Sequence, residues 1–189
     1  MREILKKIRP ALAKWIAIAF SVFVIYAMAT LRIQDLQQLA LFLSFTLALA
    51  FIRYPLHPKR PDGLSFLVID LILAGLSFEI GLYILFEYWD FIFRVGIPTK
   101  WDMTFSFLAL ALVLEATRRT VGWPLVIITF LFLLYTFFGH LLPLPLSHKG
   151  YDLDRVTTTF FMTKNGLFGV ALKTMSYFIF LFIVFGAFF

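Results

Sequence analysis

The chain has 189 residues, of which 61% are apolar, and its mean hydropathy is +0.91. Phe alone occurs 25 times, more than a soluble domain of this size can bury. The composition therefore excludes a soluble globular protein. Because long uncharged runs recur along the whole length, we predict one all-α, polytopic transmembrane helix bundle.

The formal net charge of +6 does not indicate nucleic-acid binding. The basic residues lie at the ends of apolar runs instead of forming a block or a face, which favours a role in membrane orientation. The chain has no cysteine, which excludes disulfides, thiolate metal sites and cysteine nucleophiles.

About six membrane spans are predicted from the apolar runs. A helix rises 1.5 Å per residue, so a run of about 20 residues crosses a hydrocarbon core of about 30 Å. The basic start resembles a secretory signal, but the first run is too long and lacks a small-residue cleavage site, so we interpret it as a retained span. The six runs cover residues 12–31, 36–52, 64–86, 101–116, 121–139 and 171–189.

Two connections between the runs are polar or mixed. Residues 53–63 hold three prolines and form a loop, because proline cannot continue a helix. Residues 140–170 are mixed: two prolines make a turn, Asp152 caps a short helix and Gly166 follows its end. We predict that this second connection lies along the membrane surface.

The distribution of basic residues predicts a cytoplasmic N-terminus. With that orientation ten of the 17 Lys and Arg residues fall on the cytoplasmic side, and four of the other seven belong to one long loop, where the positive-inside rule is weak. Amphipathic tryptophan rings favour the membrane interface. All four tryptophans fall at predicted span ends: Trp15, Trp89, Trp101 and Trp123.

Two carboxylates, Asp70 and Glu79, lie inside the third run, nine residues apart. At 100° per residue they point to opposite faces of a helix, so they are two separate features and not a pair. Each is a candidate ion or proton relay group, since charges inside a membrane are costly and often functional. The alternative is that each bonds to a neighbouring helix or to water.

A polar knot, defined by Glu115, Arg118 and Arg119, separates the fourth and fifth runs. The spacing i, i+3 and i+4 places these side chains together on a helix and predicts an internal ion pair. The knot is either a stop signal that sets topology or a bracket to another domain or helix.

No motif of soluble catalysis is present. None of the histidines, His57, His140 and His148, has an i, i+4 partner or an H-E-x-x-H pattern, and the chain has no phosphate-binding loop and no G-x-G-x-x-G. We therefore predict no catalytic residue, no metal site and no enzymatic activity.

Two rival interpretations stay open. One is a membrane-embedded enzyme acting on a lipid or lipid-linked substrate, with Asp70, Glu79 or His140 as its acid or base. The other is a small structural membrane protein without a transport role.

Several short motifs occur in a fixed order in the second half of the chain. They are LEATRRTVGW at 114–123, FLLY at 132–135, FG at 138–139, HKGY at 148–151 and FGAF at 185–188. This series resembles the fused permease of tripartite ATP-independent periplasmic (TRAP) transporters, in the 4TM/12TM type that works with a TAXI-class binding protein. The motif match covers residues 102–189, and the first three spans agree in placement and character.

The resemblance implies a multi-pass protein of the bacterial or archaeal inner (plasma) membrane. Residues 1–120 would be the four-span small subunit, and residues 121–189 the start of the large subunit. Such permeases import organic acids or related solutes with a sodium gradient. The implied partners are an extracytoplasmic TAXI-type solute-binding protein, the remainder of the large permease subunit and membrane lipid, with no nucleic acid.

The chain departs from this family in one large respect. The transport domain, which binds substrate and sodium, would follow the point where the sequence stops, and the last run has no polar flank at its inner end. We therefore expect a truncated scaffold portion that does not transport alone. No substrate-binding residue, sodium ligand or cofactor is assigned to it.

Overall fold

The computed structural model describes residues 2–30, 32–56, 64–141, 143 and 145–189. All the regular elements in these ranges are helical. The principal helices are α1 (Arg2–Thr30), α2 (Asp35–Arg53), α3 (Leu64–Phe86), α4 (Tyr88–Phe93), α5 (Lys100–Thr120), α6 (Trp123–Phe138), α7 (Leu153–Thr157), α8 (Val170–Thr174) and α9 (Phe180–Phe188). The last part of the predicted loop, with His57, lies outside the described residues.

The predicted all-α membrane bundle is confirmed. Five described helices are long and apolar enough to cross a membrane: Arg9–Thr30, Asp35–Arg53, Ser65–Phe86, Trp123–Leu141 and Val170–Ala187. The sixth predicted span, 101–116, lies within α5, which has 21 residues but carries charged residues at both ends and is less apolar. The cytoplasmic location of the N-terminus stays a prediction.

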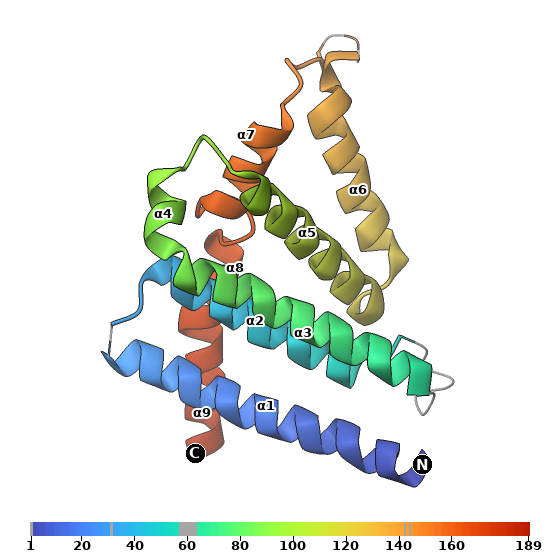
Figure 1. The fold of residues 1–189 in the computed structure, drawn as a ribbon, viewed down its shortest axis with the longest axis vertical. Coiled ribbons are helices and arrows are strands. Elements are labelled where there is room, and N and C mark those ends of the chain that lie inside the picture. Colours follow the sequence, from blue (N-terminus) through green and yellow to red (C-terminus); the bar gives the residue numbers. More distant parts are fainter. Residues whose placement is uncertain (1, 31, 57–63, 142, 144) are drawn as a thin grey trace.

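The first three helices form the base of the bundle (Figure 1), and α2 packs against both α1 and α3. More than half of α2 is buried, which makes it the centre of the fold. The long helix α5 packs on α2 and α3, and the short helix α4 connects α3 to the loop before α5. Helices α1 to α5 therefore form one packed unit.

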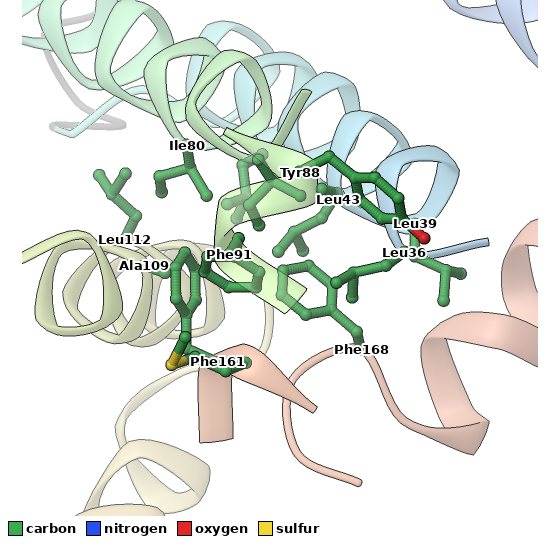
Figure 2. Close-up of a cluster of buried hydrophobic side chains, with 14 of the residues drawn as sticks. Leu36, Leu39, Leu43, Ile80, Tyr88, Phe91, Ala109, Leu112, Phe161 and Phe168 are labelled. Atoms are coloured by element: carbon green, nitrogen blue, oxygen red, sulfur yellow. The ribbon is translucent and has the colours of Figure 1, made fainter. Parts of the chain in front are cut away.

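The segment after α7 contributes side chains to the core of the bundle. It continues as a π-helical turn, η2 (Thr158–Met162), which directs Phe161 inward, and Phe168 follows from the next turn. Both rings are fully buried near Phe91 of α4 (Figure 2). The ring centroids of Phe91 and Phe161 are 5.8 Å apart, and those of Phe161 and Phe168 are also 5.8 Å apart. The aromatic side chains of this segment fill the space between α2, α4 and α5, and the location of residues 140–170 along the membrane surface stays a prediction.

Helices α6 and α9 are far less covered than α2. Almost none of the apolar surface of α6 is buried, and in Figure 1 α9 crosses α1 and α2 instead of running beside them. The chain leaves α5 through Gly122, which has φ 109° and ψ −176°, and α6 then begins with Trp123 and Pro124. Only glycine adopts that backbone conformation without strain, so Gly122 fixes the direction in which α6 departs.

We expect Gly122→Ala to destabilise the protein by about 1–3 kcal/mol, because an alanine at this backbone conformation is strained. Thermal unfolding in detergent measures the loss. The matched control is Gly75→Ala in the middle of α3, where an added methyl group meets no atom within 4 Å. An equal loss for the two variants would contradict this account of the junction.

Candidate functional site

The polar knot lies in the last turns of α5 and contains the predicted ion pair. Arg118 donates from Nε and Nη2 to the two carboxylate oxygens of Glu115, both at 2.7 Å. Arg119 donates from Nε to Oε1 of Glu115, also at 2.7 Å. Two-pronged guanidinium–carboxylate contacts of this kind are among the stronger hydrogen bonds in proteins, so the end of α5 is held as one rigid unit.

Arg119 also reaches beyond its own helix. Its Nη1 donates to Oδ1 of Asp70 on α3 at 2.6 Å and to the carbonyl of Tyr54, just after α2, at 3.2 Å. The guanidinium lies 5.0 Å from the ring centre of Phe51, and the side chain is only 3% exposed. This geometry is that of a bracket between helices, the second of the two interpretations of the knot.

Asp70 joins the knot to the first helix as well. Its other oxygen, Oδ2, accepts from Nη2 of Arg9 on α1, and the carboxylate is 1% exposed. We name Arg9, Asp70, Glu115, Arg118 and Arg119 the knot cluster. Sequence reasoning singled out Asp70 but missed its partners, because Arg9 and Arg119 are 61 and 49 residues away along the chain.

The electrostatics of the knot cluster depend on complete pairing. Taking a charge out of water costs several kcal/mol unless an opposite charge and hydrogen bonds compensate. Asp70 and Arg119 are almost fully buried, whereas Arg118 is about one quarter exposed and lies 5.6 Å from the ring centre of Trp123. The hydrogen bond to Glu115 raises the pKa of Arg118, so this residue stays charged.

Glu79 is not part of this cluster. It lies on the exposed side of α3, whereas Asp70 lies on the buried side, as the helical spacing predicts. Among the described contacts none joins Glu79 to Asp70. The two carboxylates therefore do not form a shared relay.

A second cluster, the Asp102 cluster, lies at the opposite ends of α3 and α5. The fully buried Asp102 accepts from the hydroxyl of Tyr83 at 2.6 Å, from Nε of Arg94 at 3.0 Å, and from the backbone N–H and the hydroxyl of Thr99 at 2.8 and 2.7 Å. Arg94 also contacts Glu87. The hydrogen bond to Asp102 raises the pKa of Arg94 well above its usual value.

Thr99 and Asp102 form the capping box that begins α5. The sequence signal for this cluster was the threonine followed three residues later by a carboxylate, a pattern typical of helix starts. Sequence reasoning missed it, since the residues that complete the cluster, Tyr83 and Arg94, belong to other elements. The knot cluster and the Asp102 cluster together fix the antiparallel pair of α3 and α5 at both ends.

A third group attaches the C-terminal helices to α2. Asp35, the first residue of α2, accepts from Nζ of Lys164 at 2.9 Å and from the hydroxyl of Tyr177 at 3.2 Å. Nζ of Lys173 lies 3.8 Å from the same carboxylate. Tyr177 belongs to η3 (Met175–Ile179), the π-helical turn before α9, so this contact connects the end of the chain to the centre of the bundle.

The described residues contain no group of three or more side chains that could hold a metal ion. His148 packs edge-on against Tyr135, with its Nε2 2.9 Å from the Tyr135 carbonyl oxygen, and His140 is exposed. The site chemistry of this part of the chain is therefore ion pairing between helices.

The fold and these clusters define a class: a multi-pass helical membrane protein whose buried charged residues pair with one another inside the bundle. Comparisons with models of known families, with curated proteins and with solved structures found no match.

We expect Asp70→Asn to destabilise the protein by about 3–5 kcal/mol, because it removes the anionic partner of Arg9 and leaves the buried Arg119 with Glu115 alone. Reversible unfolding by denaturant in detergent micelles measures the change. Glu79→Gln is the matched control on the same helix and is expected to change stability by less than about 0.5 kcal/mol. Equal changes in the free energy of unfolding for the two substitutions would mean that the ion pairs of Asp70 do not stabilise the bundle.

Comparison of the two knot arginines separates the bracket from the stop signal. Arg119→Ala removes contacts to three elements and is expected to cost about 3 kcal/mol or more. Arg118→Ala removes a local, partly exposed pair and is expected to cost no more than about 1 kcal/mol. Equal stability losses, together with altered accessibility of a single cysteine introduced at Ser147, would favour a stop signal.

Proposed function

We propose that this chain is the scaffold end of the permease of a TRAP transporter, which imports organic acids or related solutes with a sodium gradient. The proposal rests on the motif series between residues 102 and 189. In this proposal α1, α2, α3 and α5 correspond to the four spans of the small subunit, and Gly122 lies at the junction with the large subunit. The solute is delivered by an extracytoplasmic TAXI-type binding protein.

The structural observation that supports the proposal is that the buried charged side chains pair with one another between helices. The knot cluster and the Asp102 cluster connect helices to one another, and their buried carboxylates face guanidinium or hydroxyl donors of the same chain. A scaffold against which a transport domain moves needs such bracing, since alternating access is largely a rigid-body movement of one part against another. Substrate and sodium ligands are not assigned to this chain.

The rival interpretation as a membrane-embedded enzyme has little support from the geometry. Both oxygens of Asp70 accept hydrogen bonds from arginines, so this carboxylate does not face a substrate. Glu79 and His140 are exposed, and no described contact brings either one to a second titratable group. General acid–base catalysis needs such groups within reach of one reacting atom.

Deletion of the gene in its own host tests the proposed function. We expect loss of sodium-dependent uptake of at least one acid from a panel of radiolabelled mono- and dicarboxylic acids, and restoration by the unaltered gene. Glu79→Gln is expected to restore uptake fully, because a scaffold carboxylate on the exposed side of α3 does not relay ions.

Two results would contradict the proposal. Unchanged uptake of every acid after deletion would argue against transport. Unchanged uptake accompanied by a change in the lipid composition of the membrane would favour the enzyme.

A further inference from the structure

A groove runs between α1 and the last turns of α2, and Arg9 of the knot cluster lines it. It consists of two adjoining cavities, of about 250 and 320 Å³, which share Pro10, Ala13 and Arg53 in their walls. The remaining walls are mainly apolar, with Leu49 and Ile52 contributed by α2. The groove therefore combines apolar walls with basic side chains.

Three basic side chains line this groove, namely Arg9, Lys14 and Arg53, and no carboxylate lies among the lining residues that the structure describes. Lys14 and Arg53 are exposed and have no hydrogen-bond or ion-pair partner among the residues that the structure describes. Asp70, next to the groove, already binds Arg9 and Arg119 through its two oxygens. The described lining of the groove thus carries an excess of positive charge.

Of the three basic residues in the groove, Arg9 gives the most information about the ligand. Its Nη2 donates to Asp70, whereas Nε and Nη1 are buried and have no hydrogen-bond partner in the described protein. Buried donors without partners are rare in native proteins and call for an explanation such as a bound anion. Asp70 therefore fixes the guanidinium at the wall of the groove while two of its donors still lack a partner in the described protein.

The basic side chains and apolar walls of the groove are suited to a phosphate group attached to an apolar molecule. A guanidinium fork matches phosphate oxygens, and a lysine ammonium adds a flexible point charge. Ala13, Ala17 and Leu49 offer a small apolar surface for the glycerol and upper acyl part of a lipid. Basic pockets between membrane helices on the cytoplasmic side are typical sites for anionic lipid headgroups.

The position along the membrane agrees with this ligand. Arg9, Lys14 and Arg53 lie at the ends of α1 and α2 that the distribution of basic residues places on the cytoplasmic side. Trp15, next to Lys14, is 69% exposed, as expected for an aromatic ring at the membrane interface. We propose that this groove binds the phosphate headgroup of an anionic phospholipid.

Native mass spectrometry of the full-length protein in detergent tests the site with phosphatidylglycerol as the probe and phosphatidylcholine as the comparison lipid. We expect preferential retention of phosphatidylglycerol. Lys14→Gln combined with Arg53→Gln is expected to weaken this binding about 25-fold, since one basic residue near an anionic lipid contributes about fivefold. Both positions are exposed and outside the knot cluster, so the fold is retained.

Lys100→Gln, an exposed lysine at the start of α5, is the matched control and should leave retention unchanged. Inorganic phosphate at millimolar concentration should not displace the lipid, because it makes no contact with the apolar walls. Three results would overturn the proposal: equal retention of the two lipids, an unchanged double variant, or displacement by phosphate, which would indicate a free-anion site.

Discussion

The buried carboxylate of Asp70, held between Arg9 and Arg119, is the interaction on which the arrangement of the helices depends. Its partners come from α1 and α5, and Arg119 also binds the carbonyl that follows α2. An unpaired charge in this environment costs several kcal/mol, so sliding any of these helices by one turn is strongly unfavourable. One residue of α3 therefore fixes the relative positions of α1, α3 and α5.

The Asp102 cluster likewise pairs a buried carboxylate with an arginine, at the other end of the pair formed by α3 and α5. Lipid tails are as apolar as the helix surfaces, so hydrophobic burial does not by itself drive membrane helices together. Close packing and polar contacts have to supply the association. The buried rings of Phe91, Phe161 and Phe168 fill the space between the helices, and the two clusters set the register in which this packing occurs.

Sequence patterns predicted what depends on local spacing. Hydropathy located the helices, the i, i+3 and i+4 positions of the knot predicted its ion pair, and helical geometry placed Asp70 and Glu79 on different faces. The contacts of Asp70 were not predictable in this way, because periodicity carries no information on partners 49 or 61 residues away. Hydropathy likewise does not distinguish a phenylalanine that faces lipid from one in the core, which is why the burial of Phe161 was missed.

Arg9 belongs both to the knot cluster and to the groove proposed to bind lipid. Its Nη2 binds Asp70, its Nε and Nη1 have no partner in the described protein, and the residue lines the groove between α1 and α2. A phosphate in the groove that reaches these donors leaves the bond to Asp70 intact. It supplies partners for donors that are otherwise buried and unsatisfied, which reduces the free-energy cost of burying Arg9. Binding free energies are reciprocal. An anionic lipid that stabilises the knot cluster therefore binds more tightly when the cluster is assembled, so the membrane itself contributes to the rigidity of the scaffold.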